Sequence, residues 1–238
     1  MDSPLHSRRV VLTGLTVAGL ASTAAASPVV APPAFRGQHV AKPLPFNPAK
    51  LNGLSEKLLV SHHDNNYAGA IKNLNRLEQE LAQVTPETPA FVVGGLRQSE
   101  LTYRNSMTLH EAYFGNLGGN GKASGAVAAA IAGAYGSFDN WALHFRSIGA
   151  SLGGGSGWVV LACELMTGEL RTVGANHHTQ ALATSLPLLV MDMYEHAYAM
   201  DYGAAAAKYI DAFFANIQWD MVNQRLEQAD KLSRPLRG

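Results

Sequence analysis

The sequence predicts an α+β protein, with an N-terminal antiparallel helical hairpin followed by an α/β domain that contains a three-stranded antiparallel sheet. Three observations predict this class. Apolar residues recur at helical spacing up to about residue 117, three short apolar runs follow between residues 158 and 191, and helical patterns then return. No internal repeat interrupts this order of helices, strands and helices.

Residues 1–26 predict a twin-arginine signal peptide. Arg8 and Arg9 precede a mostly apolar stretch, and residues 24–26 form a plausible small-residue cleavage site. A transmembrane anchor is the alternative, but the run is short and rich in Ala, Gly and Thr. We therefore expect the twin-arginine translocase to export the folded chain to the periplasm or the extracellular space, with no stable membrane anchor. Residues 27–43, rich in Pro and Ala, predict a disordered lead-in.

Residues 44–120 predict the helical hairpin domain. Between Leu51 and Val84 apolar positions recur at helical spacing, and Pro86 and Pro89 end that helix. A second helix is expected over residues 94–117, closed by the glycine-rich residues 118–121. The short connection between the two helices makes them antiparallel neighbours.

Residues 121–238 predict the α/β domain. Two helices are expected at 123–135 and 138–148, and the glycine-rich segment 153–157 leads into the first strand. Strands are expected at 158–162, 169–173 and 187–191, and the later helices from about 194, at 204–217 and at 219–231. The single cysteine, Cys163, cannot form an internal disulfide and is expected to serve packing.

Charge excludes one class of partner. The formal net charge of the 238 residues is zero, with 18 basic and 18 acidic side chains and no basic cluster. We therefore expect no nucleic-acid partner.

A carboxylate and three imidazoles form a candidate metal site. Asp192 and His196 are four residues apart, a spacing that can direct both side chains to one point at a strand end or on a helix. A solvated helical ion pair is the alternative, but the apolar run 187–191 indicates a buried strand that carries Asp192 into the interior. His62 and His110 lie in the two helices of the hairpin, so each helix offers one histidine. Such a set suits a redox-active metal such as iron or manganese.

Four motifs, in order along the chain, carry a family resemblance. They are His62-His63 with Leu74-Asn75, His110 with Tyr113-Phe114, the G-S-G-W of Gly155–Trp158, and the D-x-[WY]-E-H-A-Y of Asp192–Tyr198. With these motifs the chain resembles the iron/manganese superoxide dismutase family from about Leu44 to the C-terminus. The resemblance implies superoxide dismutation at one iron or manganese ion per subunit of a homodimer or tetramer, held by His62, His110, Asp192 and His196.

The resemblance also implies roles around the metal. Glu195 is expected to bond a ligand histidine of a partner subunit, and Tyr198 to lie at the subunit interface, with core packing as its alternative. Trp158 is expected to contact Asp192 and tune its charge. Phe114 and Tyr194 stand where the family usually has tryptophan.

The register of the first ligand leaves two alternatives. Without a gap His62 is the ligand, and the family's gateway histidine and tyrosine become Asn66 and Ala70. In the other register His63 and Tyr67 stand at the gateway, but Leu59, which cannot ligate, faces the metal. We adopt the first, and therefore expect an entrance without phenol or imidazole that is wider than usual.

The glutamine that usually holds the metal-bound solvent is also missing, because its two positions are Gly154 and Ser106. We expect a polar replacement from residues 176–180, with His177 and His178 as the candidates and an exposed polar loop without a role at the site as the alternative. These departures keep a second hypothesis open, a metal-binding homologue with little or no dismutase turnover.

Overall fold

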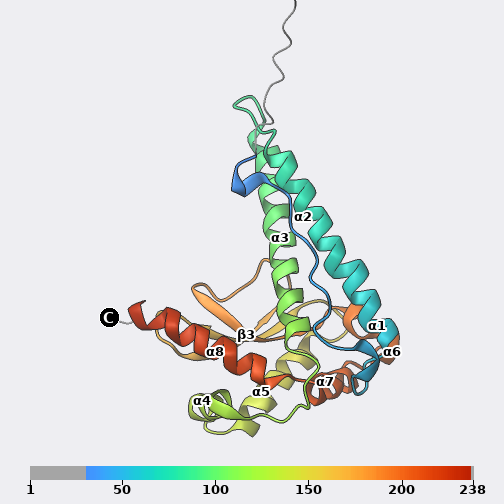
Figure 1. The fold of residues 1–238 in the computed structure, drawn as a ribbon, viewed down its shortest axis with the longest axis vertical. Helices are drawn as coiled ribbons and strands as arrows, with labels where there is room; N and C mark the ends of the chain where they lie inside the picture. Colours follow the sequence, from blue (N-terminus) through green and yellow to red (C-terminus); the bar gives the residue numbers. More distant parts are fainter. Residues whose placement is uncertain (1–30, 237–238) are drawn as a thin grey trace, which may run out of the picture. The chain divides into compact units, whose positions relative to one another are not determined.

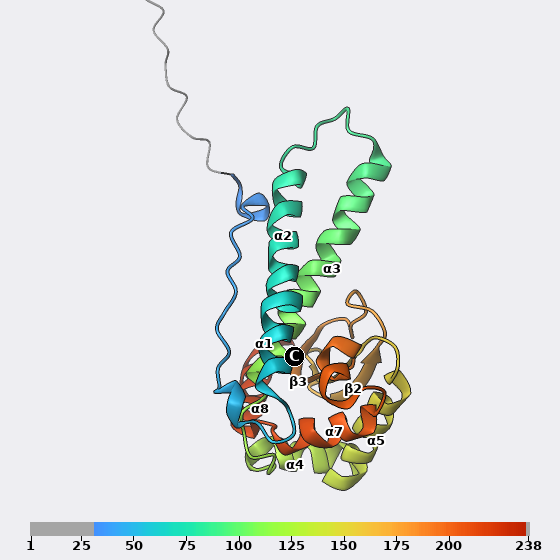
Figure 2. The ribbon, with the colours of Figure 1, turned by 90° about the vertical axis from the view of Figure 1, so that its right-hand side faces the viewer.

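Two long antiparallel helices, α2 (Ala68–Leu81) and α3 (Ala90–Gly115), form the N-terminal hairpin and lie side by side in both views of the ribbon (Figures 1 and 2). This computed structural model describes residues 31–236, so the predicted signal peptide lies outside the described residues. Helix α3 begins four residues before the predicted Gly94, directly after Pro89, whose fixed φ suits the entry to a helix.

The first helix of the hairpin is built in three pieces. The short helix α1 (Glu56–Ser61) begins at Ser55, whose hydroxyl accepts a hydrogen bond from the Leu58 amide at 3.1 Å. A π-helical turn, η3 (His62–Tyr67), then joins α1 to α2. A π-helical turn holds more residues than an α-helical one, so it changes which side chains share a face.

The sheet has three antiparallel strands in the order β2-β1-β3, which confirms the predicted fold class. They are β1 (Trp158–Glu164), β2 (Leu170–Ala175) and β3 (Ser185–Asp192). The β1–β3 pairing shifts between Leu161 and Ala162, opposite Pro187, which has no amide hydrogen to donate to the ladder. Trp158 pairs with Ala175 on one side and with Asp192 on the other.

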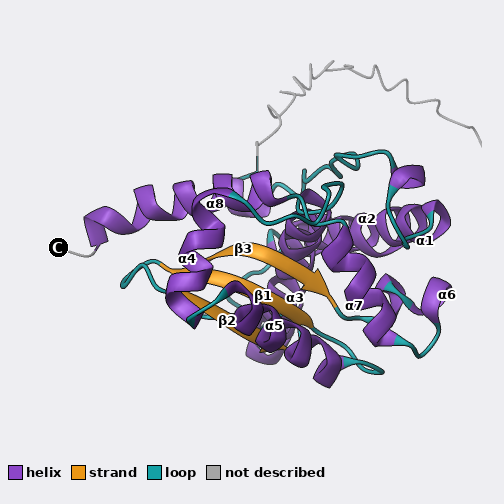
Figure 3. Ribbon diagram, turned by 90° about the horizontal axis from the view of Figure 1, so that it is seen from below, coloured by secondary structure: helices purple, strands orange, loops and turns teal. Residues whose placement is uncertain are grey.

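Helices enclose this sheet (Figure 3). Helix α5 (Phe138–Leu152) packs on β1 and β2, whereas α3 and α8 (Trp219–Ser233) pack on β3. The remaining helices are α4 (Gly125–Tyr135), α6 (Ala199–Tyr202) and α7 (Ala206–Ala215). Because both β1 and β3 are buried along most of their length, they read as continuous apolar runs in the sequence.

The segment before the hairpin differs from the predicted disordered lead-in. Residues 32–46, which we call the strap, run along the hairpin in Figure 2 and include the short 3-10 helix η1 (Pro33–Phe35). The side chain of Asn75 bonds both backbone groups of His39, at 2.8 and 2.9 Å. The buried carboxylate of Glu78 bonds the Gly37 amide and the His39 ring, both at 2.8 Å. Composition alone does not reveal these bonds, because their partners lie far along the chain.

Candidate metal centre

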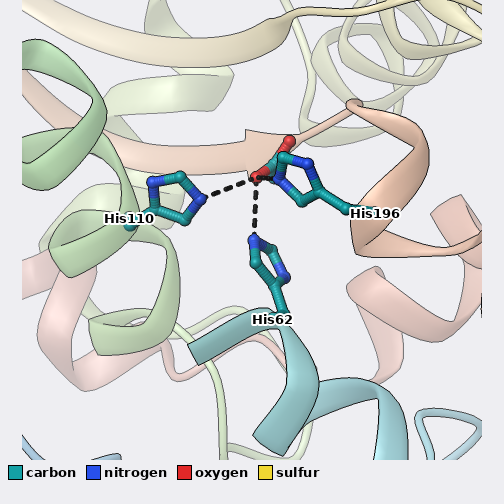
Figure 4. A group of neighbouring side chains, drawn as sticks. His62, His110 and His196 are labelled. Atoms are coloured by element: carbon teal, nitrogen blue, oxygen red, sulfur yellow. Dashed lines mark hydrogen bonds and ion pairs between the residues drawn. The ribbon is translucent and has the colours of Figure 1, made fainter. Parts of the chain in front are cut away.

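Four side chains converge where the hairpin meets the end of β3. One donor atom from each of His62, His110, Asp192 and His196 lies within 4.8 Å of the other three. Figure 4 shows the three histidine rings pointing toward one another around a carboxylate oxygen. The structure thus brings together all four predicted ligands, from η3, α3, β3 and the 3-10 helix η4 (Glu195–Ala197).

Asp192 lies at the centre of the group. Its Oδ2 is 3.1 Å from His62 Nε2, 3.2 Å from His196 Nε2 and 3.6 Å from His110 Nε2. Its Oδ1 accepts a hydrogen bond from the Tyr194 amide at 2.8 Å, which fixes the carboxylate plane. One oxygen is therefore held by the backbone, while the other faces the three rings.

His110 has a defined tautomer. Its Nδ1 lies 2.7 Å from the Ser106 carbonyl oxygen, which can only accept, so Nδ1 carries the proton. Its Nε2 then presents a lone pair to the cluster, and this nitrogen is buried with no hydrogen-bond partner among the described residues. A ring oriented in this way by a backbone carbonyl is the usual arrangement of a metal-binding histidine.

His62 is also unsatisfied. Neither of its ring nitrogens has a hydrogen-bond partner among the described residues, and the ring is fully buried. Its Nε2 is close to Asp192 Oδ2, but the contact lacks hydrogen-bond geometry. A buried nitrogen without a partner costs about 1–3 kcal/mol. A cation bound among these atoms would satisfy both His62 Nε2 and His110 Nε2, so the residues present fit a metal ion.

Electrostatics favour the ligating forms of these groups. Burial lowers the pKa of His62 and lowers the pKa of His110 to about 3, so both rings are neutral near pH 7. Burial raises the pKa of Asp192, but its contacts with His196 and His62 outweigh burial and hold that pKa well below its usual range. Neutral imidazoles beside an ionised carboxylate are the states that bind a divalent or trivalent cation.

Aromatic rings enclose the cluster. The Tyr194 ring stacks on His196 at 5.4 Å and on His178 at 4.7 Å between ring centroids. The Phe114 ring lies 5.0 Å from the His62 ring and is buried. Phe114 and Tyr194 thus both belong to the aromatic enclosure of the cluster.

Trp158 lies beside Asp192 in the β1–β3 pairing, but its indole N–H does not bond the Asp192 carboxylate. Its Nε1–H donates to His178 Nδ1 at 3.0 Å, while the Trp158 ring contacts His110 at 5.1 Å between centroids. Because the indole can only donate, His178 Nδ1 must be the acceptor and its proton sits on Nε2. Burial lowers the pKa of His178 to about 4, so this ring is neutral near pH 7.

The two histidines proposed as glutamine replacements have different positions. The His178 ring lies 6.4 Å from the His110 ring, close enough to contact a small ligand in the cluster. His177 is exposed and bonds Thr179 at 2.9 Å. The structure therefore places His178, and not His177, beside the candidate centre.

A phenol lies beside the cluster, although Asn66 and Ala70, the positions expected at the gateway, carry none. The Tyr67 ring is 6.2 Å from the His110 ring, and the His63 ring is 5.3 Å from Tyr67. Ala70 is buried in α2. Asn66 is half-buried, and within residues 31–236 no hydrogen bond or ion pair joins it to the cluster. The π-helical turn explains the difference, because its extra residue per turn brings Tyr67 near the same face as His62.

Glu195, Tyr198 and Ser106, which the sequence analysis also named, have different surroundings. Glu195 is exposed on η4, where a partner subunit could reach it. Tyr198 is buried, accepts a hydrogen bond from the Gly154 amide at 3.0 Å and stacks on Tyr209. The Ser106 hydroxyl lies 3.3 Å from His110 Nδ1, beside the stronger carbonyl contact.

Two tyrosines at the site were missed by the sequence analysis as functional residues. Tyr209 donates its one hydroxyl proton to the Asp192 carbonyl oxygen at 2.6 Å, and its hydroxyl oxygen lies 3.3 Å from the Tyr113 hydroxyl. The Tyr113 ring is 5.3 Å from the His62 ring. Burial raises the pKa of both phenols, so they remain neutral donors beneath the cluster. Only the helical spacing of Tyr113 from His110 could have indicated such a role.

Comparison with known proteins agrees with this geometry. Residues 123–225 match the model of the C-terminal domain of iron/manganese superoxide dismutases. A superoxide dismutase [Fe] of Cupriavidus metallidurans is 48% identical over 189 residues, which cover 79% of this chain and 96% of the relative. A superoxide dismutase [Mn] 1 of Halobacterium salinarum is 34% identical over 194 residues, covering 79% and 94%. A superoxide dismutase [Fe] of Aquifex aeolicus is 31% identical over 201 residues, covering 81% and 93%.

Within residues 31–236 no helix combines the length and the apolar character that crossing a bilayer requires.

Proposed function

We propose that this chain, which belongs to the iron/manganese superoxide dismutase family, converts superoxide to dioxygen and hydrogen peroxide at a single iron or manganese ion. The observation that carries the proposal is the buried cluster of three histidine nitrogens around one Asp192 oxygen, with two of those nitrogens otherwise unsatisfied. Relatives named for iron and relatives named for manganese both align with the chain, so the proposal includes either metal.

The four ligands would be His62, His110, Asp192 and His196. The metal would supply one-electron redox chemistry, accepting an electron from one superoxide and donating it to the next. Asp192 contributes a negative charge that lowers the tendency of the site to take up electrons, and the Tyr194 amide and neighbouring rings set how strongly that charge acts. The wall of aromatic rings limits the water that reaches the ligands.

Activity per bound metal is the decisive test. The purified mature chain should contain iron or manganese in amounts approaching one ion per chain, and it should remove superoxide in proportion to that metal. Metal without superoxide removal would instead support the alternative function, a metal-binding homologue with little or no turnover. Tyr67 and His178, whose rings lie 6.2 and 6.4 Å from the His110 ring, support the dismutase over that alternative.

His178 is expected to replace the missing glutamine. Its Nε2–H is the only ring donor left once Nδ1 accepts from Trp158, so it can donate to a solvent molecule bound in the cluster. Changing His178→Ala should lower turnover per bound metal by about 10–100-fold, the usual cost of losing an outer-sphere partner. Metal analysis and superoxide assays measure the effect, with His177→Ala as the matched control. Equal losses in both variants would refute the role of His178.

Export is proposed from residues that the structure does not describe. Arg8 and Arg9, with the apolar stretch after them, are typical of the twin-arginine route, which carries folded proteins and so suits a metal acquired before export. Changing both to lysine should leave unprocessed precursor in the cytoplasm, visible by fractionation and immunoblotting, whereas Arg36→Lys should not. Normal processing and export of the double variant would contradict the prediction.

The mature protein is also proposed to assemble as a homodimer or a tetramer. The exposure of Glu195 supports this proposal, in which its carboxylate would bond a ligand histidine of a partner subunit. Superoxide would be its only substrate partner.

A further inference from the structure

We infer that Glu111, held by Lys42 of the strap, is a positioning residue that engages the only proton of the Tyr67 phenol and so withholds it from anions bound at the metal centre. This inference rests on the proposed function for its consequence, but the contacts themselves stand without it. Neither Glu111 nor Lys42 belongs to the motifs from which the family was identified.

Lys42 touches the wall of the site at three points. Its backbone amide donates to the Tyr67 hydroxyl at 3.0 Å, and its carbonyl oxygen lies 2.8 Å from His63 Nε2. Its ammonium group forms an ion pair with Glu111 Oε2. A single residue of the strap therefore contacts three residues on η3 and α3, around a cavity of about 170 Å³.

Within residues 31–236 the Tyr67 hydroxyl makes two hydrogen bonds. The hydroxyl has one proton, which it donates to Glu111 Oε1 at 3.0 Å, and it accepts from the Lys42 amide. An ordinary phenol keeps this proton near neutral pH. The Glu111 carboxylate forms an ion pair with Lys42 and can only accept, so the direction of the Tyr67–Glu111 bond is fixed.

The consequence concerns anions that enter the site. While Glu111 holds the proton, Tyr67 can accept hydrogen bonds from a ligand or from water but cannot donate one to an anion. Superoxide, peroxide and azide all need donors. Releasing the phenol from Glu111 should therefore strengthen anion binding at the metal.

The strap is attached independently of Lys42. Asn75 and Glu78 hold its residues 37–39, and Lys42 itself has a side chain that is 72% exposed. Substitutions at Glu111 should therefore leave the strap and the hairpin in place.

The test compares two neutral replacements of similar size. Glu111→Gln keeps an oxygen that can accept the Tyr67 proton, whereas Glu111→Met has none. The iron-loaded Met variant should bind azide about tenfold more tightly than the Gln variant, the value expected for one hydrogen bond to a charged group. In a Tyr67→Phe background the two replacements should bind azide equally, because no phenol proton remains to be released.

Equal azide affinities of the Gln and Met variants in the native background would overturn the inference. So would a difference that persists in the Tyr67→Phe background, since it would come from packing alone. If Glu111→Met does not fold, Glu111→Ala provides the same loss of the acceptor.

A second measurement needs no metal and so separates this inference from the proposed function. In the metal-free chain labelled at tyrosine Cζ, the Tyr67 carbon signal, assigned with Tyr67→Phe, should shift in Glu111→Met and stay in place in Glu111→Gln. An unchanged signal in Glu111→Met would show that Glu111 does not hold the proton, even in a protein that bound neither iron nor manganese.

Discussion

Changing His62→Ala should abolish metal binding, whereas changing the adjacent His63→Ala should leave the metal in place. His62 Nε2 lies 3.1 Å from the Asp192 oxygen and has no hydrogen-bond partner among the described residues, so a cation is the partner that suits it. The His63 ring points to the strap, where its Nε2 contacts the Lys42 carbonyl oxygen. Its Nδ1 contacts the carboxylate of the neighbouring Asp64 on η3. Comparing these two variants therefore separates the loss of a metal ligand from the loss of any imidazole in the same turn.

The expected size of the effect is large. Losing an outer-sphere partner of a metal-binding residue usually weakens binding or activity by about 10–100-fold, and losing a ligand itself should weaken metal binding by at least about 100-fold. Metal analysis after dialysis, with superoxide assays on the same samples, measures both quantities. Full metal content in His62→Ala, or loss of the metal only in His63→Ala, would show that His62 is not the ligand.

The same turn shows what the sequence could and could not predict. Helical spacing placed His62 and His110 on facing helices, and the apolar run before Asp192 placed its carboxylate in the interior. The sequence analysis then treated His62 at the metal and Tyr67 beside it as exclusive, because each belongs to a different register against the family pattern. The structure has both, because the turn from His62 to Tyr67 is π-helical. A single widened turn leaves no clear mark in apolar periodicity.

Contacts between distant segments were the other limit. The sequence analysis named residues 176–180 as the source of a replacement for glutamine, and His178 is the member that reaches the site. It did not foresee that Trp158 would donate to His178 and not to Asp192, since both are compatible with the strand pairing. The strap was missed altogether, because its Pro- and Ala-rich composition is typical of disorder while its order comes from Asn75, Glu78 and Tyr67.

Acid should destabilise the metal-free protein through its buried histidines. His110 has an ordinary pKa of 6.5 in the unfolded chain, but burial lowers its pKa to about 3 in the folded protein. Between those two values the unfolded chain binds a proton that the folded chain does not, so the free energy of unfolding falls as the pH is lowered. His62 is shifted in the same direction by burial and adds to the effect.

The magnitude follows from linkage. Each histidine that remains neutral when folded should remove about 1.4 kcal/mol of stability per pH unit below about pH 6. The Asp192 pKa is held below its usual range by His196 and His62 despite burial, so its stabilisation is lost only at still lower pH, below its ordinary value of 3.8. The histidines therefore dominate between pH 6 and 4.

Urea unfolding of the metal-free chain at several pH values between 7 and 4, with a chelator present, measures this slope. His110→Gln should flatten it, because glutamine does not titrate, whereas the exposed His177→Gln should leave it unchanged. A slope that is the same in all three proteins would mean that His110 is protonated in the folded state. Such a ring would carry no free lone pair at Nε2, and His110 could then bind a metal only after giving up that proton. The acid slope therefore tests the protonation state on which the whole ligand set depends.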